Sequence, residues 1–486
     1  MRICLINPPR IHPKSWGIPG AFQPLDIAYV AAMLEKSHKV QIIDSPTEGL
    51  ANFEELDETR YRVGLKEEEL EKRIKQWSPD LVGITVPFSG WSRTAFETVS
   101  SIKKVDKDVP VFLEGLHASA RPASCLKNSK ADYVVIGEPE NTVYELASFL
   151  ELERSKKLEE VRGIAFNKNG KTIINPPRPL IDDLDSLPFP ARHLLPMEKY
   201  FLQVRKNPLR GEICSPWASV LTSRGCPYNC VFCTAHILMG KKWRARSPEN
   251  VIEELEQLVQ TYKIKQVDFT DDNMTFDRKR MERICDLIIE HGLDIEWFTG
   301  NGVRADTLDE NLLRKMKLSG CKNLRLAPES GVQRVVDQII RKNLDLRRIE
   351  QAVVLCRRIG IKVGCFFVIG LIGETKKDIE ATIEYARKLK RLGANRFYFS
   401  FAMPQYGTEL YKQAKKEGYL RPDFNDDALS AAKPLIETAE FTINDLLILG
   451  NEGNKINPTL TQDKLAQAIR NPVKTLKILF GKRKNI

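Results

Sequence analysis

Three cysteines lie close together in the stretch "RGCPYNCVFCTAH", and their spacing indicates metal chemistry. Cys226, Cys230 and Cys233 follow the pattern CxxxCxxC, with no second cysteine pair in step. Structural zinc sites usually close with four ligands, often from two separated pairs, so His236 or the distant Cys214 would have to complete one. Three thiolates suit a [4Fe–4S] cluster better. One iron then lacks a protein ligand and can bind a substrate or cofactor, which indicates reaction chemistry.

The remaining cysteines are scattered, mostly through apolar segments: Cys4, Cys125, Cys214, Cys285, Cys321, Cys356 and Cys365. Ten cysteines in 486 residues are too few for a disulfide scaffold. Isolated buried thiols pack as small hydrophobic groups. The N-terminal run "MRICLINPPR" is stopped by prolines and predicts a strand, not a signal peptide. No apolar run approaches the roughly 18 residues of a membrane-spanning helix. A reducing cytoplasmic location is expected.

The charge balance is basic, with 75 Lys+Arg against 64 Asp+Glu and a net charge of +11. Such an excess can favour anionic partners. Much of it lies on helical faces such as "RKLKRLG", and no aromatic–basic stripe or nucleic-acid motif is present, so no nucleic-acid partner is expected. The terminal segment "NPVKTLKILFGKRKNI" has apolar residues at helical spacing among lysines. It predicts either peripheral contact with a membrane surface or a docking helix with a frayed end.

The elements around these residues divide the chain into four predicted parts. Residues 1–152 alternate short apolar runs with helical segments and predict five strands: "RICLINPP", "KVQIID", "DLVGITV", "VPVFLEG" and "ADYVVIG". This alternation is typical of a doubly wound, Rossmann-like parallel sheet. Ligands of such sheets bind at the carboxyl ends of the strands.

Residues 153–212 predict a hairpin, turning at Asn169-Gly170, and then an extended proline-rich linker over the surface. Residues 213–420 predict six βα units in a full or partial TIM-like barrel, with strands "WASVLTS", "QVDFTDD", "IEWFTGNG", "NLRLAPES", "KVGCFFVIG" and "RFYFSF". The cysteine motif follows the first of these strands, at the end where barrels carry their functional loops. Residues 421–486 predict a small helical region with a basic tail.

The cysteine motif resembles the signature CxxxCxΦC of the radical S-adenosylmethionine (radical SAM) enzymes, with Phe232 before the last cysteine. The resemblance implies that the three thiolates hold a [4Fe–4S] cluster. S-adenosylmethionine would chelate the open iron, and an electron from a donor such as flavodoxin or ferredoxin would release a 5′-deoxyadenosyl radical. In that family the aromatic residue lies beside the adenine, which assigns this place to Phe232.

Later segments resemble the same family in the same order. "DFTDDNMTF" would place Asp271, Asp272 and Asn273 at the rim, and "LAPESG" would turn Glu329 and Ser330 toward the ribose or methionine part of the cofactor. "VIGLIGET" is similar to the segment G-x-P-G-E-T, with Ile372 where proline is common. Its Glu374 has a second interpretation, as a carboxylate that starts the following helix.

The first domain resembles that of cobalamin-binding radical SAM enzymes. "EGLHASARP" is similar to a GGxHxSxxP segment, with Glu114 in place of a glycine, and "VVIGEPE" to a G-E-x-E segment. The motif D-x-H-x-x-G, which supplies a histidine to cobalt, is missing from the sequence. Residues at the carboxyl ends of the strands are candidates to line the corrin: Asp44, Ser89, Gly90, Gly115, His117 and Gly137. His117 is a candidate cobalt ligand, or a histidine held by hydrogen bonds within its loop.

This resemblance implies a radical SAM enzyme that methylates an unactivated carbon of an organic substrate through methylcobalamin, using one S-adenosylmethionine for the radical and a second to re-methylate cobalamin. The alternative within the family is a cyclase or rearrangement enzyme similar to the anaerobic porphyrin-ring cyclase. An alternative of another class is a non-enzymatic, metal-bearing binding protein. The substrate itself has no signature in the sequence.

Overall fold

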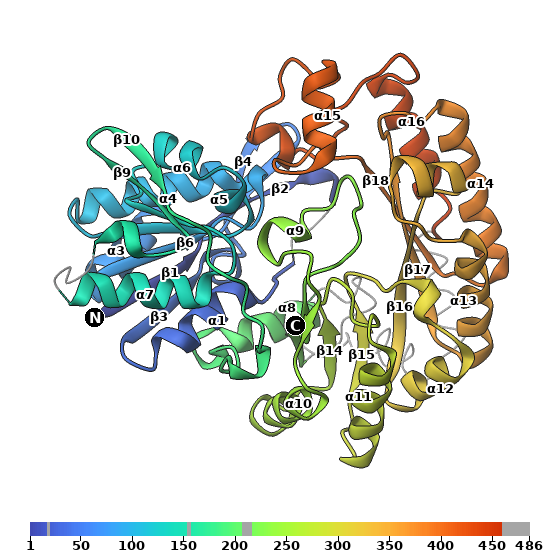
Figure 1. Ribbon diagram of the computed structural model, residues 1–486, viewed down its shortest axis with the longest axis horizontal. Helices are drawn as coiled ribbons and strands as arrows, with labels where there is room; N and C mark the ends of the chain where they lie inside the picture. The colour runs from blue at the N-terminus through green and yellow to red at the C-terminus, as the bar shows by residue number, and fades with distance from the viewer. Residues whose placement is uncertain (17–19, 153–156, 207–215, 459–486) are drawn as a thin grey trace, which may run out of the picture.

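The structure, a computed structural model, describes residues 1–16, 20–152, 157–206 and 216–458. Figure 1 shows a sheet domain from the N-terminal third of the chain beside a larger domain, with α9 between them. Cys214 and the basic C-terminal segment lie outside the described residues. None of the helices formed by the described residues is long and apolar enough to cross a membrane.

The first sheet confirms the predicted doubly wound domain. Its five parallel strands lie in the order β8-β7-β6-β1-β3. Their bounds are β1 Arg2–Asn7, β3 Lys39–Asp44, β6 Leu81–Thr85, β7 Val111–Glu114 and β8 Tyr133–Val135. Nearly continuous apolar runs form these strands because both faces of a parallel sheet are covered. The strand order reverses between β1 and β6, where sheets of this type bind ligands beyond the carboxyl ends.

Helices cover both faces of this sheet. One face carries α1 (Leu25–Leu34) and α7 (Pro139–Glu151), and the other carries α3 (Glu67–Trp77), α4 (Ser92–Val105), α5 (Leu116–Ala120) and α6 (Pro122–Asn128). A short helix, α2 (Ser45–Glu48), follows β3. Each long helix directs an apolar stripe at the sheet, as its 3.6-residue period requires.

The predicted hairpin is present as β9 (Ile164–Lys168) and β10 (Lys171–Ile174), and it extends the first sheet antiparallel to β8. Asn169 and Gly170 both have positive φ, as the two central residues of a type I′ turn require. A second small sheet was not predicted, formed by β2 (Arg10–Pro13), β5 (Arg60–Val63) and β4 (Phe53–Asp57). Its segments are only four or five residues long, too short for the alternation of apolar and polar residues to mark a strand clearly, and Phe53–Asp57 carries three acidic residues.

The second sheet confirms the partial barrel, with six parallel strands in the order β11-β14-β15-β16-β17-β18. They are β11 Trp217–Val220, β14 Gln266–Phe269, β15 Glu296–Thr299, β16 Cys321–Glu329, β17 Lys362–Ile369 and β18 Arg396–Phe401. The helices of the outer layer are α10 Pro248–Tyr262, α11 Arg278–Glu290, α12 Glu310–Leu318, α13 Leu346–Ile359 and α14 Lys376–Leu392. Side chains of Ser247, Asp277, Asp309, Asp345 and Thr375 cap the helices at their N-termini.

The linker differs from its prediction. It was expected to run over a surface. Instead, apolar residues that alternate with its prolines are buried, and most of them pack against Met33: Ile181, Leu184, Leu187 and Ala191. The helix that follows, α8 (Met197–Lys206), also contributes to one apolar core that runs from the α1 face of the first sheet to the barrel. The two domains are therefore packed together through the linker.

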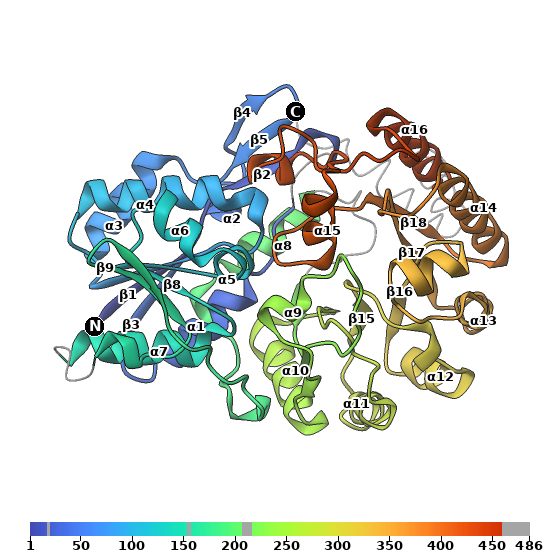
Figure 2. The ribbon, with the colours of Figure 1, turned by 45° about the horizontal axis from the view of Figure 1, so that its top comes forward.

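The C-terminal part closes over both domains. After β18 come α15 (Glu409–Glu417), the short helix η9 (Asp427–Ser430) and α16 (Ile443–Asn454), which packs on α14 and β18. The turned view in Figure 2 shows the segment between α15 and α16 beside the small sheet of the first domain, where η9 contacts β2.

Candidate active site

The three cysteines lie on a loop that leaves and re-enters the barrel at one place. We call residues 225–243 the cysteine loop. Its two ends are the short strands β12 (Ser223–Arg224) and β13 (Arg244–Ala245), which pair antiparallel. The loop contains one helical turn, α9 (Ala235–Leu238), which lies between the two domains in Figure 1. Gly225 has a φ of 82° at the start of the loop, where a side chain would overlap the Lys242 carbonyl oxygen.

Backbone hydrogen bonds fasten the tip of the loop to the barrel side. The Val231 amide donates to the Ile340 carbonyl oxygen at 3.1 Å, and the Leu410 amide donates to the Val231 carbonyl oxygen at 2.9 Å. Within the loop, the Nε2 atom of His236 lies 3.0 Å from the Cys226 carbonyl oxygen. His236 is therefore engaged in holding the loop.

All three thiols are free and partly exposed. Burial raises the pKa of each thiol, that of Cys233 to about 12, and the charges of Cys226 and Cys230 add to the effect at Cys233. The Cys233 amide donates to the Cys230 carbonyl oxygen at 3.0 Å, so the last two cysteines lie on one turn of the loop. Among the described residues, no three His, Cys, Asp or Glu side chains surround a single ion position. Three thiols spread over one loop fit the [4Fe–4S] group, since its irons are bound by separate sulfurs.

Two positive charges stand near these thiols. Arg304 and Lys342 both lower the pKa of Cys226 and of Cys230, opposing the effect of burial. Arg304 lies over the Tyr228 ring at 3.7 Å and donates to the Lys342 carbonyl oxygen at 3.0 Å. Because metal ligation requires thiolates, cationic groups beside the loop favour it.

A cavity of about 190 Å³ lies beside the cysteine loop, lined by residues of the loop, of the barrel and by Leu116 of the first domain. Asp272 is exposed to this cavity. Burial and then the neighbouring Asp271 raise the pKa of Asp272 to about 6. Asn273 is almost fully buried, and neither its amide nitrogen nor its amide oxygen has a hydrogen-bond partner. Buried polar groups are rarely left unpaired, so Asn273 fits a polar ligand such as S-adenosylmethionine.

Asp271, expected at the rim, instead holds the strand ends together. Its carboxylate accepts from the Thr222 amide at 3.1 Å, the Thr222 hydroxyl at 2.6 Å and the Ser223 hydroxyl at 2.5 Å. Three donors leave this buried carboxylate little capacity for a ligand. The sequence alone could not separate Asp271 from Asp272, because both are aspartates at adjacent positions.

The segment after β16 holds Glu329 and Ser330 in different ways. Glu329 has a φ of 64°, a strained conformation that often marks a functional site, and its carboxylate pairs with Lys342 Nζ at 2.8 Å. Ser330 is fully buried, with its hydroxyl 3.0 Å from that of Thr382. Phe232 packs on the apolar cluster around Val231. Glu329 and Phe232 thus lie on the side of the barrel that carries the cysteine loop. The cofactor contacts of Glu329, Ser330 and Phe232 stay predictions.

Glu374 closes the turn after β17. Its Oε2 atom accepts from the Gly370 amide at 2.8 Å and from the Leu371 amide at 3.1 Å. Burial raises the pKa of Glu374 to about 8. Its role here is to order the turn, in which Ile372 is also buried.

The candidate corrin residues lie at the expected ends of the first sheet. Asp44 is fully buried and accepts from Asn7 Nδ2 at 2.7 Å and from the Tyr200 hydroxyl at 2.5 Å. Gly115 and Gly137 both have positive φ, and a side chain at Gly137 would meet open space. Gly137, which lies beside open space, fits the approach of a large ligand such as cobalamin, whereas a Cβ atom at Gly115 would lie 3.0 Å from the Val86 carbonyl oxygen.

Three other candidates are covered. His117 is fully buried, its Nδ1 lies 2.9 Å from the Ser89 hydroxyl, and burial lowers its pKa to about 4. Its Nε2 atom lies 3.7 Å from Asp426, in the segment before η9. Gly90 is so close to Ser430 that a Cβ atom would lie 2.6 Å from the Ser430 amide nitrogen. The hydrogen-bonded interpretation of His117 is the one this geometry favours.

Charged residues that sequence reasoning did not assign join the cysteine loop to the first domain. Arg224 and Arg244, at the two ends of the loop, pair with Glu138 and Glu140 at the start of α7. The G-E-x-E segment and the arginine before the first cysteine were both visible in the sequence. Their pairing was not, because it joins residues about a hundred positions apart.

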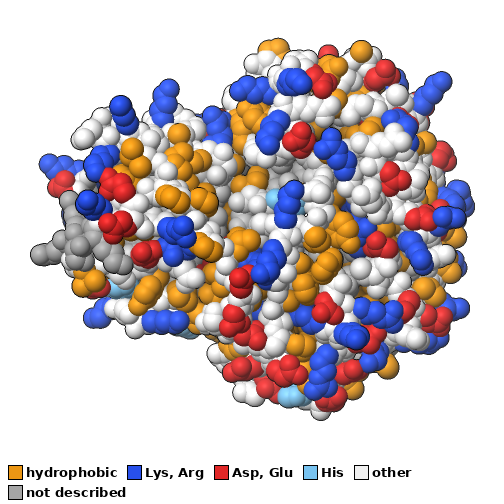
Figure 3. All heavy atoms as spheres, in the orientation of Figure 1, with side chains coloured by type: hydrophobic (Ala, Val, Ile, Leu, Met, Phe, Trp, Pro, Cys, Tyr) orange, Lys and Arg blue, Asp and Glu red, His pale blue; other side chains and the backbone are white. Residues whose placement is uncertain are grey.

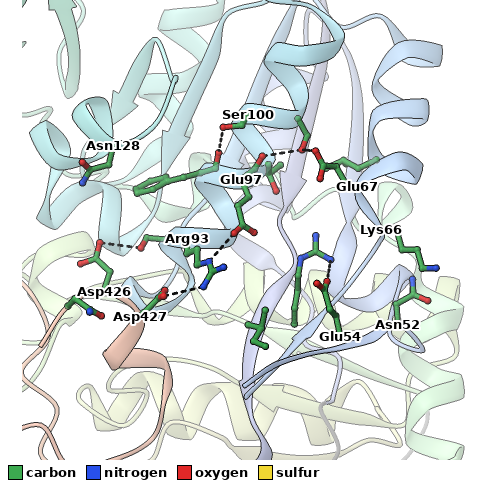
Figure 4. Close-up of a pocket in the computed structure, with 18 of the residues that line it drawn as sticks. Asn52, Glu54, Lys66, Glu67, Arg93, Glu97, Ser100, Asn128, Asp426 and Asp427 are labelled. Carbon is green, nitrogen blue, oxygen red and sulfur yellow. Dashed lines mark hydrogen bonds and ion pairs between the residues drawn. The ribbon is translucent and has the colours of Figure 1, made fainter. Parts of the chain in front are cut away.

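A groove of about 1,480 Å³ lies elsewhere, between α3, α4, the small sheet and the segment before η9. Figure 4 shows several of its charged side chains paired with one another, including Arg93 with Glu97 and Asp427. The described residues that line it include none of the cysteine loop. Figure 3 shows positive and negative side chains interspersed over the face of the molecule seen in Figure 1.

Comparison with known proteins agrees with this geometry. The model of the radical SAM superfamily matches residues 220–386, and that of the B12 binding domain matches residues 18–147. An uncharacterized methyltransferase of Pyrococcus horikoshii is 34% identical over 85% of this chain and 83% of its own length. Cytidylyl-2-hydroxyethylphosphonate methyltransferase of Streptomyces wedmorensis is 32% identical over 84% of this chain and 80% of its own length.

A more distant relative is the anaerobic magnesium-protoporphyrin IX monomethyl ester cyclase of Rubrivivax gelatinosus, 27% identical over 80% of this chain and 66% of its own length. Among solved structures, the radical S-adenosylmethionine methyltransferase TsrM of Kitasatospora setae superposes with a TM-score of 0.67 at 18% identity, over 86% of this chain and 77% of TsrM, and shows the same fold. The chain therefore belongs to the radical SAM enzymes that carry an N-terminal B12-binding domain, the family of the cobalamin-dependent radical SAM methyltransferases.

Proposed function

We propose that this enzyme transfers a methyl group to an unactivated carbon of an organic substrate, using a [4Fe–4S] cluster, S-adenosylmethionine and cobalamin. One observation carries the proposal: the cysteine loop is fastened to the barrel at its tip and to the B12-binding domain at both its ends. A loop held in this way would bring a cluster held by its cysteines and a cobalamin held by the first domain to one interface. Two relatives of this chain are methyltransferases, which supports methyl transfer as the reaction.

In this proposal Cys226, Cys230 and Cys233 hold the cluster. The bound cofactors supply radical formation and methyl transfer, while the protein binds, orients and shields them. Phe232, Asp272, Asn273, Glu329 and Ser330 form the side toward S-adenosylmethionine. Asp44, Ser89, Gly90, Gly115, His117 and Gly137 form the corrin side, with η9 displaced from Gly90 where the ligand approaches. The domain limits 1–152, 153–212, 213–420 and 421–486 are part of the same proposal.

Cyclisation is the second candidate, because a cyclase is among the relatives. The two reactions leave different coproducts. Methylation consumes S-adenosylmethionine in two ways and yields both S-adenosylhomocysteine and 5′-deoxyadenosine, whereas cyclisation yields 5′-deoxyadenosine alone. Both coproducts can be looked for before the substrate is known. With a chemical reductant present, methylation of the reduced cobalamin would give one equivalent of S-adenosylhomocysteine, and uncoupled cleavage would give 5′-deoxyadenosine.

The experiment is anaerobic reconstitution with iron, sulfide and hydroxocobalamin, followed by metal analysis and quantification of both coproducts. Near four irons with stoichiometric cobalt, and both coproducts, would support methyl transfer. A Cys226/Cys230/Cys233→Ala triple variant should lose the iron. Iron with 5′-deoxyadenosine but no S-adenosylhomocysteine would favour cyclisation, and zinc alone would contradict the cluster assignment.

The reaction also needs an external reductant, for which we propose flavodoxin or ferredoxin in the cytoplasm. All nine described cysteines are free, which suits a reducing compartment. Peripheral membrane contact through the basic C-terminal segment remains a prediction outside the described residues.

A further inference from the structure

Four buried charges join the two ends of the cysteine loop to the B12-binding domain, and we call them the interdomain ion-pair cluster: Glu138, Glu140, Arg224 and Arg244. Arg224 lies 3.1 Å from Glu138 and 2.5 Å from Glu140. Arg244 lies 2.9 Å from both carboxylate oxygens of Glu138. Each of the four side chains is less than 5% exposed.

The Arg244 guanidinium group makes further hydrogen bonds to backbone carbonyl oxygens. It donates to the Ile181 carbonyl oxygen at 2.6 Å and to the Met239 carbonyl oxygen at 2.7 Å, and Glu138 accepts from the Ile181 amide at 2.8 Å. Arg224 lies over the Tyr29 ring of α1 at 5.3 Å. The cluster therefore joins α1, α7, the linker and both ends of the loop. Planar guanidinium groups held from several sides allow little change of geometry.

The interdomain ion-pair cluster lies between the carboxyl end of β8 and the cysteine loop. Glu138 follows Gly137 directly, at the open carboxyl end of β8, and Arg224 precedes the first cysteine by two residues while lining the cavity that Asp272 and Leu116 share. The tip of the loop is fixed to the barrel through hydrogen bonds of Val231. If the interdomain ion-pair cluster loosens, the tip of the cysteine loop can stay attached to the barrel while the two ends of the loop move relative to the B12-binding domain.

We infer that Glu138 and Glu140 are positioning residues that set the distance between the cluster-bound S-adenosylmethionine and the corrin. This inference rests on the proposed function. A buried ion pair adds little net stability compared with apolar packing. We therefore infer that these pairs serve to hold one particular geometry. The paired arginines lie at both ends of one loop, so the same four charges fix both its position and its direction.

The test uses the full-length reconstituted enzyme in three forms: wild type, the double variant Glu138→Gln/Glu140→Gln, and the control Glu254→Gln. Glu254 is an equally buried carboxylate between two arginines, Arg192 and Arg246, but it joins the linker to the barrel. Both variants lose buried charge, and only the double variant loses the contact with the B12-binding domain. Glu140→Gln alone, which removes only the pair with Arg224, replaces the double variant if that protein fails to fold.

Three readouts follow: iron content, hydrogen–deuterium exchange of residues 224–245, and the molar ratio of S-adenosylhomocysteine to 5′-deoxyadenosine. A pulsed-EPR distance between the reduced cluster and cob(II)alamin gives a measure that does not depend on turnover. We expect the double variant to keep its iron, to exchange the loop ends faster, to broaden the measured distance, and to lower the ratio about tenfold, the change that 1.4 kcal/mol of misplacement would cause. Glu254→Gln should leave the distance and the ratio unchanged.

The outcomes separate the two claims. A wild-type enzyme that forms no S-adenosylhomocysteine contradicts the proposed function itself. A wild-type enzyme that forms it, with an unchanged ratio and distance in the double variant, overturns only the positioning role. An equal loss in Glu254→Gln would also overturn it, because general destabilisation would then explain the effect.

Discussion

Asn273 shows most directly how a single residue of the site differs from its neighbours. Its buried amide has no partner, whereas Asp271 and Ser330 nearby are fully engaged. We predict that Asn273→Ala weakens S-adenosylmethionine binding about tenfold without lowering the melting temperature, because an unpaired amide stabilises nothing in the free protein. Anaerobic equilibrium dialysis and thermal denaturation measure the two effects.

Thr275→Ala is the matched control for this prediction. It removes a buried hydroxyl that lies 2.7 Å from the Thr307 hydroxyl and is not among the residues proposed to face the cofactor, so it should lower stability by about 1 kcal/mol and leave S-adenosylmethionine binding unchanged. Tight binding retained in Asn273→Ala, or a large drop in its melting temperature, would show that the amide has a structural role.

Glu374 yields a prediction about pH. Burial raises its pKa in the folded protein to about 8, above the unfolded value of 4.5. The folded state then binds the proton more tightly, so the stabilising contribution is present below pH 4.5 and is lost as pH rises through 8. Glu374→Gln keeps an oxygen acceptor for the Gly370 and Leu371 amides and removes the proton. The variant should become the more stable protein at pH 8, and wild type should lose about 3 kcal/mol relative to it between pH 5 and 8.

Urea denaturation of both proteins at pH 5, 6.5 and 8 measures this difference. Parallel pH profiles for wild type and variant would mean that the carboxyl group is already ionised throughout the range, with its charge compensated by the two backbone amides.

At the scale of elements, the cysteine loop depends on the conformation of its first residue. Gly225 has a positive φ, and a Cβ atom there would overlap the Lys242 carbonyl oxygen. We predict that Gly225→Ala lowers stability by about 2 kcal/mol and reduces iron incorporation several-fold, because strain at this turn displaces the loop. Gly292→Ala is the control: it also has a positive φ but meets no atom within 4 Å, so its iron content should equal that of wild type.

Iron analysis after identical reconstitution compares the two variants. Equal iron loss in both would attribute the effect to backbone conformation in general, and equal retention would show that the loop tolerates displacement at this end.

The elements also show what the sequence can predict. The parallel strands of both sheets were predictable, since buried apolar runs such as "KVGCFFVI" alternate with capped helices. The proximity of the three cysteines was predictable because all of them lie on one short segment. Strands with charged sequences, such as Phe53–Asp57, were missed because no apolar period marks them. Pairs such as Glu140 with Arg224 were missed because a single sequence does not show which distant charges meet.

At the scale of the whole molecule, the C-terminal part fastens the barrel to the first domain through η9. Arg60 donates to the Asp427 carbonyl oxygen and to the Ser430 hydroxyl, both at 2.9 Å. On the other side, Arg121 lies 3.4 Å from Asp426. Gly90 permits this contact because any side chain there would meet the Ser430 backbone. The B12-binding domain is thus held by the interdomain ion-pair cluster on one side and by η9 on another.

We predict that Gly90→Ala displaces η9 and raises hydrogen exchange of residues 426–431 at least tenfold, since the added methyl group has no space while Ser430 stays in place. Ser92→Ala, which removes only a 3.3 Å hydrogen bond to Asp426, should change exchange far less. Absorbance titration with hydroxocobalamin distinguishes what Gly90 faces. If Gly90 faces only η9, the variant opens that contact and keeps or gains corrin affinity, and Gly90 would then not belong to the proposed corrin side. A loss of affinity together with the predicted rise in exchange would place the corrin against Gly90, and η9 would then have to leave this position before the cofactor binds. Unchanged exchange would contradict the contact between Gly90 and η9.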